Sequence, residues 1–394
     1  MKLFYKNEQV KFSKGRLVLR GLLLILLLIA VPAAYILPQL LVTGDPADYY
    51  SEYIFPALSF LPLSISSFFI FSLTEMAVVV GSLALIVLAV AFIIKVIKLA
   101  AKSDARHLLH FLYVVGRNLL IIALIAAIIF ELMHGINYGR TSVKDRLELD
   151  ASERSEEDFE QTLLWAYIGM INARRQLGED YNGVAHMQTN FDTIVYDANC
   201  IVSAVSNYYD LGLSPNYIRA KAVSLSSLWS YTYITGMYDP FLCEANINTD
   251  YLDILHFPVT VCHEICHAKG YASETDANTI AVISCINSSR PDFQYAGYYY
   301  IFMRLISEGV EVGDYVSATD WAMVSRDIAA YNAYHASLET GPVAEFIESF
   351  SEDANNAFLE SNGQTGGTAT YRVSKDIYVE YFCRYIRDYA EDNS

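Results

Sequence analysis

Three long apolar runs in the first third of the chain constrain its fold more than any other feature. They cover residues 21–42, 76–94 and about 112–133 of the 394 residues. A helix needs about 20 apolar residues to cross the hydrocarbon core of a bilayer, and each run reaches that length. Buried core helices are the alternative, which the apolar character of residues 22–30 and 77–94 on every helix face disfavours. We therefore predict three transmembrane helices.

Charged residues beside these runs predict the orientation of the chain. Six basic residues precede the first run and four lie between the second and the third, whereas three acids follow the first. Because basic loops stay on the cytoplasmic side, we expect a cytoplasmic N-terminus and an extracytoplasmic chain after about residue 135. The basic start and the small residues Ala33 and Ala34 are also typical of a signal peptide, whose removal would leave the later domain on the same side. The predicted location is the cell membrane, crossed several times.

The charge distribution divides the chain into a membrane anchor, residues 1–140, and an extracytoplasmic domain, residues 141–394. The anchor has a net charge of +5 and the domain one of −22, which together give the −17 of the chain. So acidic a domain argues against nucleic acid as a partner and against tight docking on anionic lipid. All six cysteines lie in the domain. Their even number permits disulfides outside the cytoplasm, but their spacing fixes no pairing.

Helical periodicity dominates the domain, so the predicted fold class is mainly α with a small edge sheet. The best strand signal is the alternating segment 244–248. Helices are expected near residues 159–175, 190–208, 294–311, 317–336, 342–360 and 373–390. Between the first two spans, the apolar segment 54–73 is broken by prolines, which predicts a re-entrant or interfacial segment. Glu75, at the start of the second span, is expected to be solvated.

The motif H-E-x-x-H, formed by His263, Glu264 and His267, is the strongest chemical signal in the domain. Two histidines four residues apart project from one face of a helix and can bind one metal ion, most often Zn²⁺. The glutamate between them then points to the water beside the metal and can act as its general base. Pro258 suits the first turn of such a helix, and Gly270 suits the position just past its end. The motif therefore predicts a zinc hydrolase.

The third ligand comes from one of two acids beyond the turn. Glu274 follows His267 by seven residues, and Asp276 follows by nine. Ser273 and Asp276 resemble a capping box, in which Asp276 is engaged at the helix start. Glu274 is then free to reach the metal, and we expect it to be the ligand, with Asp276 as the alternative. Asn278, one turn further on the same face, is expected to support Glu274 by a hydrogen bond.

Two other functions fit the same motif. In the first, the chain is a non-catalytic membrane receptor or scaffold in which zinc only holds the fold together. Such a closed site needs a fourth protein ligand, for which Cys266 and His256 are the nearest candidates, although the intact Glu264 speaks against it. In the second, a zinc hydrolase cuts a cell-wall amide. The other histidines are expected to be surface or core groups: His107, His110, His134, His186 and His335.

The sequence resembles a bacterial family called domain of unknown function 3810. The stretch HEICHAKGYASETDANTIAVISC is similar to the H-E-x-x-H-Q-x-G-x-x-x-E-x-E-A-N stretch of that family. Further similar blocks are residues 134–140, 239–248 and 361–367, together with Tyr371. The departures, Ala268 for the usual Gln and Leu242-Cys243 for Thr-Gly, touch no expected ligand. The resemblance implies a membrane-anchored zinc metallopeptidase-like protein and no particular substrate.

Motif and resemblance together predict a membrane-bound zinc metallopeptidase with a zincin-like, gluzincin-type site. His263, His267 and Glu274 are the expected zinc ligands, and Glu264 is the expected base, which passes its proton to the leaving amine. The substrate is expected to be a peptide or protein that lies along residues 244–248 as an edge strand. A donor that stabilises the transition state is also expected, and Tyr371 is a candidate.

Overall fold

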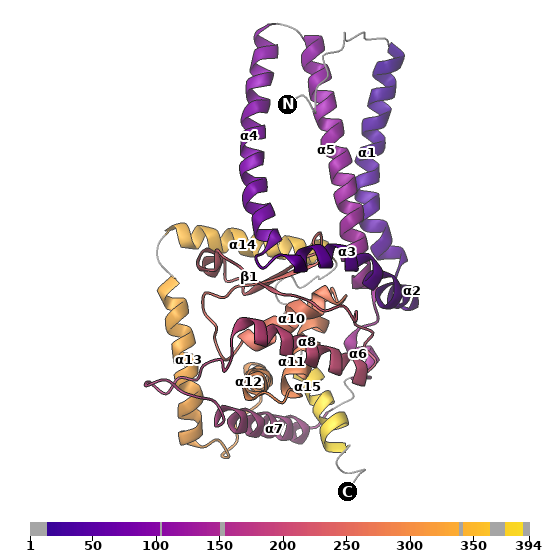
Figure 1. Cartoon of the computed structure of the whole chain (residues 1–394). Coiled ribbons are helices and arrows are strands. Elements are labelled where there is room, and N and C mark those ends of the chain that lie inside the picture. The colour runs from indigo at the N-terminus through magenta and orange to yellow at the C-terminus, as the bar shows by residue number, and fades with distance from the viewer. Residues whose placement is uncertain (1–13, 103–104, 150–153, 339–341, 363–374, 389–394) are drawn as a thin grey trace.

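The computed structural model describes residues 14–102, 105–149, 154–338, 342–362 and 375–388. Its elements confirm a mainly helical fold with one small sheet. Three long helices project from one side of a helical domain, and α10 and α11 lie in the middle of that domain (Figure 1).

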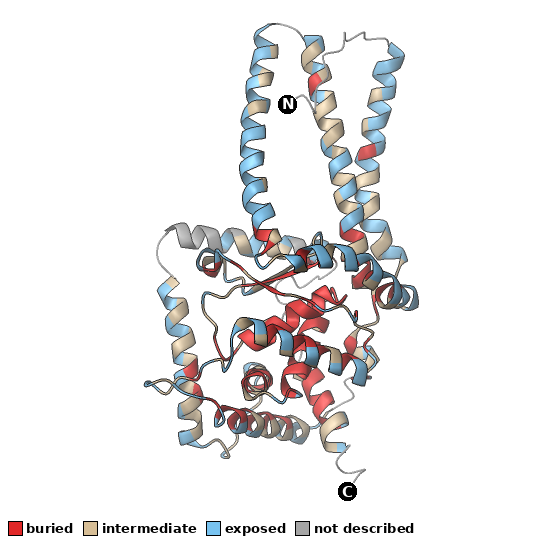
Figure 2. Cartoon of the chain, viewed as in Figure 1, coloured by how far each residue is buried: buried red, intermediate tan, exposed pale blue. Residues whose placement is uncertain are grey.

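The three long helices are α1 (Lys14–Leu41), α4 (Leu73–Ala101) and α5 (Ala105–Met133). Each is long and apolar enough to cross a membrane, which confirms the three expected apolar helices. Their apolar side chains are largely exposed, whereas buried residues concentrate in the domain (Figure 2). Because exposed apolar surface of this extent is unfavourable in water, these helices fit a lipid environment. α1 packs along α5.

The core of the domain is built by α7 (Glu156–Arg174), α8 (Phe191–Tyr208), α10 (Phe257–Ala268), α11 (Glu274–Ile286) and α12 (Pro291–Ser307). α10 and α11 are buried on nearly every face and pack on each other, on α8 and on α12. The remaining α-helices are α2 (Asp45–Tyr49), α3 (Phe55–Phe68), α6 (Val143–Arg146), α9 (Ser226–Trp229), α13 (Ala318–Leu338), α14 (Pro342–Ser361) and α15 (Lys375–Phe382). All six expected helices of the domain are present, with ends shifted by a few residues.

A three-stranded sheet covers α10. It contains β1 (Lys221–Ala222), β2 (Gly236–Asp239) and β3 (Glu244–Ile247) in the order β1-β3-β2. β3 pairs with β1 in parallel and with β2 in antiparallel orientation. The prediction that residues 244–248 form an edge strand is therefore wrong, because β3 is the central strand. The alternating pattern of β3 showed a strand but not its neighbours.

The two faces of the sheet contact different parts of the chain. Ala245 and Ile247 of β3 are buried in the domain core, and Gly236 of β2 lies against Glu264 of α10. The opposite face carries Glu244 and Asn246, which contact the segment that enters α4. The sheet is thus a single layer between α10 and the start of a candidate membrane helix.

Glu244 joins the sheet to the N-terminus of α4. Its carboxylate accepts hydrogen bonds from the Ser66 hydroxyl at 2.5 Å, the Ser72 hydroxyl at 2.9 Å and the backbone N–H groups of Leu73 at 3.3 Å and Thr74 at 3.0 Å. The first N–H groups of a helix lack partners within the helix and carry partial positive charge. A carboxylate from a distant strand therefore caps this helix.

Further contacts attach the segment between α1 and α4 to the domain. Glu75 is buried and accepts the backbone N–H groups of Ser224 at 2.9 Å and Leu225 at 2.7 Å. The expectation of a solvated Glu75 is wrong, because the chain after β1 comes close enough to present two unpaired donors. Helix α3 lies against the domain, where the Pro56 carbonyl accepts the Asn216 side-chain amide. The proposed boundary between residues 140 and 141 stays a prediction, although these contacts cross it.

We expect Glu244→Ala to destabilise the full-length protein. The substitution leaves the N–H groups of Leu73 and Thr74 and the Ser66 hydroxyl without this acceptor, at a cost of about 1–3 kcal/mol. Thermal unfolding of the detergent-solubilised chain measures the effect, with the exposed Glu311→Ala as the matched control. An unchanged unfolding midpoint for Glu244→Ala would show that this cap does not stabilise the fold.

Candidate metal centre

The motif helix and the helix after it are joined by a tight turn. Pro258 lies in the first turn of α10, as expected. Gly270 has φ +102°, and a Cβ there would lie 3.1 Å from the Phe55 ring of α3. Glycine is required on both counts, because other residues rarely adopt this φ. Ser273 then caps α11 by accepting the backbone N–H of Asp276 at 3.4 Å.

This turn brings His263, His267 and Glu274 together. The two imidazole Nε2 atoms are 2.9 Å apart. Oε2 of Glu274 lies 3.1 Å from Nε2 of His263 and 3.4 Å from Nε2 of His267. Donors that each bind one ion at about 2 Å are separated by roughly 3 Å. The three side chains are buried and could hold a metal ion.

Charge within the group favours a cation. Burial lowers the pKa of His267, but Glu274 and Glu264 outweigh it and raise this pKa to about 9. Burial raises the pKa of Glu274, yet the two imidazoles outweigh it and hold this pKa below its ordinary value. Both shifts show that positive charge among these side chains is stabilised, as a metal ion requires.

The geometry separates the two candidate acids. Glu274 reaches both imidazoles, whereas Asp276 points to the segment after α5. Its Oδ1 accepts the backbone N–H of Val143, the first residue of α6, at 2.8 Å. Asp276 therefore joins α11 to α6 and takes no part in the donor group. The spacing argument that favoured Glu274 agrees with this arrangement.

Hydrogen bonding fixes the orientation of His267. Its Nδ1 lies 2.7 Å from the carbonyl oxygen of Tyr271, an acceptor only, so Nδ1 carries the proton. When the imidazole is neutral, its lone pair is therefore on Nε2 and directed toward the other donors, which is the arrangement of metal-binding histidines. Asn278 is buried one turn after Glu274 on α11, and its supporting role stays a prediction.

Glu264 lies beside the donor group with one oxygen unpaired. The side chain is buried, and Oε2 has no hydrogen-bond partner among the described residues. Strand β2 passes directly over it, since a Cβ on Gly236 would lie 2.6 Å from the Glu264 carboxylate. A buried carboxylate oxygen without a hydrogen-bond partner lowers the stability of the fold. Its position next to three convergent donors therefore suggests that Glu264 has a functional role.

Two aromatic residues near the group were not expected from the sequence. The ring of His134, the first residue after α5, lies 6.1 Å from the His267 ring. Tyr238 of β2 stacks on the His267 ring at 6.4 Å and lies 5.6 Å from the His134 ring. His134 was expected to be an ordinary surface or core histidine. His134 is not separated from another histidine by a spacing typical of metal ligands. The one sequence signal that could have identified it is its position in residues 134–140, a block that resembles the family.

Burial and the neighbouring His267 lower the pKa of His134 to about 3, so this imidazole is neutral at physiological pH. Its Nδ1 is buried and has no hydrogen-bond partner among the described residues, while Nε2 lies 3.3 Å from the Tyr138 hydroxyl. Burial also raises the pKa of Tyr238 well above its ordinary value, so its hydroxyl keeps its proton. Both side chains are uncharged and polar beside the donor group.

Arg140 connects the turn after α10 to the segment that leaves α5. Its Nη1 donates to the Gly270 carbonyl at 2.8 Å, and its Nη2 donates to the Leu211 carbonyl at 2.9 Å. The guanidinium lies 4.0 Å from the centre of the Tyr271 ring. Tyr271 also supplies the acceptor of His267. A buried arginine next to the candidate membrane helix therefore supports the backbone that carries the metal donors.

The other residues considered from the sequence lie elsewhere. Cys266 is buried in the core, and His256 pairs with Asp253 at 2.9 Å. Neither joins the donor group, and within the described residues no fourth His, Cys, Asp or Glu does. All six cysteines are free thiols. Tyr371, the sequence candidate for a transition-state donor, lies outside the described residues.

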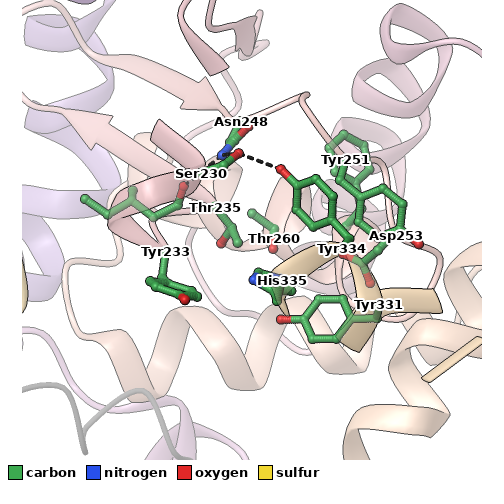
Figure 3. Close-up of a pocket in the computed structure, with 12 residues that line it drawn as sticks. Ser230, Tyr233, Thr235, Asn248, Tyr251, Asp253, Thr260, Tyr331, Tyr334 and His335 are labelled. Carbon is green, nitrogen blue, oxygen red and sulfur yellow. Dashed lines mark hydrogen bonds between the residues drawn. The ribbon is translucent and has the colours of Figure 1, made fainter. Parts of the chain in front are cut away.

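A pocket open to solvent lies next to β2 and α10. Figure 3 shows Tyr331, Tyr334 and His335 of α13 facing residues from the sheet side of the domain. Thr235 lines it and immediately precedes Gly236, and Thr260 lines it one turn before Glu264. The hydroxyl of Tyr334 donates to Ser230 at 2.7 Å. This pocket, half of whose lining residues are aromatic, therefore lies next to the segments that carry Gly236 and Glu264.

Comparison with known proteins gives one match. The family model described as "Protein of unknown function (DUF3810)" matches residues 50–376. No curated protein and no solved structure matches the chain.

We expect the purified full-length protein to bind about one divalent transition-metal ion per chain. His263→Ala and Glu274→Gln each remove a donor and should weaken binding by more than the roughly 10–100-fold that an outer contact costs. Asp276→Asn is the matched control. The asparagine amide oxygen can still accept the Val143 N–H, and position 276 contributes no atom to the metal donor group. Elemental analysis after equilibrium dialysis measures this. A loss of metal from Asp276→Asn but not from Glu274→Gln would reverse the assignment.

Proposed function

The chain belongs to the DUF3810 family, whose description assigns no activity, and we propose that it is a zinc-dependent metallopeptidase anchored in the cell membrane. His263, His267 and Glu274 hold the ion in a zincin-like, gluzincin-type site, and Glu264 is the general base. The reaction is the hydrolysis of a peptide bond by water.

The observation that carries this proposal is the buried, unpaired Oε2 of Glu264 beside three convergent donors. A site that only held the fold together would gain nothing from a desolvated carboxylate, because burying it costs free energy. Two imidazoles and one carboxylate are a typical donor set for catalytic zinc, which keeps a fourth position for water or substrate. In the part of the chain that the structure describes, no fourth donor closes this set.

The residues of the chain account for the proton transfers. A bound Zn²⁺ would polarise the scissile carbonyl and acidify the attacking water. Glu264 takes a proton from that water and delivers it to the nitrogen of the leaving amine, as the new C–O bond forms and the C–N bond breaks. Burial raises the pKa of Glu264, which suits a carboxylate that holds a proton between these two steps.

We assign the stabilisation of the developing oxyanion to His134 and Tyr238. Both side chains keep a proton at neutral pH, for the reasons of burial given above. Both lie beside His267. Neutral N–H and O–H donors held in a buried site lower the energy of a transition state in which negative charge develops. Tyr371, which lies outside the described residues, stays a further candidate for this role.

The orientation of the chain is part of the proposal. The basic residues before the first span and between the second and third place those segments in the cytoplasm. The ends of α1 and α5 that meet the domain, and the start of α4, then lie on the extracytoplasmic side. The acidic domain and its metal centre accordingly face outside the cell membrane.

We expect Glu264→Gln to abolish peptide cleavage without loss of zinc. Removal of a general base lowers kcat by roughly 100–10,000-fold, while the three donors are untouched. Wild type and variant, both full-length in detergent, are compared for zinc content and for cleavage of a mixed peptide library by mass spectrometry. The full chain is used because contacts of residues 45–75 with the domain would be lost from residues 141–394 alone.

Zinc bound to wild type without cleavage of any peptide, either free or anchored in a membrane, would contradict the proposal. Equal cleavage by wild type and Glu264→Gln would remove Glu264 from its role.

We expect His134→Phe to lower kcat while KM and zinc content stay near their wild-type values. Loss of one oxyanion donor costs roughly 100–1,000-fold in kcat, and phenylalanine preserves the ring that packs on His267. His186→Phe is the matched control, because the His186 side chain is 58% exposed and lies away from the metal centre. A rise in KM at unchanged kcat would show that His134 contributes to substrate binding instead.

A further inference from the structure

We propose that the substrate is a membrane-anchored polypeptide, which binds as an added strand on the free edge of β2 and is cut within a few residues of its own membrane span. This inference rests on the proposed peptidase function and names its substrate class. It follows from where β2 begins, where it ends and which of its backbone groups are unpaired.

The outer edge of β2 has backbone groups available for a further strand. The Asn248 N–H donates to the Thr235 carbonyl at 2.9 Å, so Thr235 faces β3. Since the direction of backbone groups alternates along an antiparallel pair, Met237 and Asp239 also face β3. Gly236 and Tyr238 then direct their N–H and C=O groups to the outer edge. No backbone hydrogen bond between described segments reaches these groups.

The same two residues contact the catalytic machinery. Gly236 lies against the carboxylate of Glu264, and Tyr238 stacks on His267. A peptide that pairs with Gly236 and Tyr238 is therefore held next to the base and the metal donors. Strand addition supplies main-chain hydrogen bonds whatever the side chains are, so the edge fixes the position of the scissile bond.

β2 also leads to the membrane. Asp239, its last residue, accepts a hydrogen bond from the Thr74 hydroxyl at 2.9 Å. Thr74 lies in the first turn of α4, two residues before the apolar run that begins at Met76. His134 connects the metal centre to α5 in the same way, because it follows Met133, the last residue of that helix. The metal centre therefore lies between the ends of two membrane helices.

The short path along β2 from the base to the start of α4 restricts the kind of substrate that can bind. A strand advances about 3.3 Å per residue and a sheet layer is about 10 Å thick. A peptide on β2 that passes the base therefore reaches the membrane boundary after about three to five residues. A chain that leaves its own span at this boundary can follow that path directly. A folded soluble protein would have to place a long extended loop between the domain and the lipid.

The aromatic pocket receives the other end of the substrate. Thr235 lines it (Figure 3). This residue precedes Gly236, at the end of β2 opposite to Asp239, which contacts α4. Tyr251 and Tyr334 stack there at 4.4 Å, and Tyr233 and His335 stack at 5.5 Å. Flat aromatic walls favour an aromatic or aliphatic side chain. We therefore expect such a residue on the side of the scissile bond away from the membrane.

The test uses two forms of one probe with full-length protein in vesicles of phosphatidylcholine and phosphatidylglycerol. The first form is a randomised peptide of roughly 30 residues, about 100 Å when extended, fused to one leucine-rich membrane helix of about 20 residues. The second form is the same peptide without the helix. Cleavage sites are mapped by mass spectrometry.

A second readout does not require catalysis. Met237→p-benzoyl-phenylalanine, placed on β2 in a chain that also carries Glu264→Gln, reports contact with the probe by photo-crosslinking. The control position is Tyr181→p-benzoyl-phenylalanine, since Tyr181 is 98% exposed and lies outside the sheet.

We expect cleavage of the anchored probe about three to five residues from its span, as the distances along the sheet dictate, and crosslinks from position 237 to the same region but none from position 181. Cuts at all distances from the span would show only a raised local concentration at the membrane and would overturn the inference. Equal cleavage of the free peptide would also overturn it, with the peptidase function intact. Crosslinks without cleavage would support the docking site and contradict the peptidase function. If neither cleavage nor crosslinks are observed, both the docking site and the peptidase function are contradicted.

Discussion

The buried carboxylate of Glu244 is the contact on which the arrangement of this protein depends. It belongs to the central strand of the sheet, yet its partners are the N-terminus of α4 and two serines that precede it. A desolvated carboxylate is stable only with such donors, and a helix N-terminus offers them together with partial positive charge. One face of the sheet is thereby held against the start of α4, a candidate membrane helix, and the other face covers α10.

This position of the sheet explains how the metal centre is assembled. α10 and α11 bring the three donors together by themselves, but the groups around them come from the sheet and from the segment after α5. Gly236 and Tyr238 belong to β2, and His134 and Arg140 belong to the segment that follows α5. Residues next to the ends of α4 and α5, two candidate membrane helices, therefore surround the donor group.

The donor group could be anticipated because it is local. His263 and His267 are separated by one helical turn, Gly270 permits the tight turn, and Ser273 caps α11, so that Glu274 returns to the imidazoles. The choice between Glu274 and Asp276 followed from the same capping geometry. The sheet could not be anticipated in this way. Residues 244–248 showed their own alternation, but a strand signal does not state which neighbours flank it, and so the central strand was taken for an edge.

The sequence by itself determined the features that depend on periodicity and short spacing: three apolar helices long enough for a membrane, the helical character of the domain and the H-E-x-x-H donors with their third acid. Only the tertiary structure decided that His134, Tyr238 and Arg140 meet at those donors, and that Glu75 and Glu244 are buried contacts. The physical reason is separation along the chain. His134 and His267 are 133 positions apart, and their contact arises from packing of the domain against the ends of the long apolar helices, which no local pattern records.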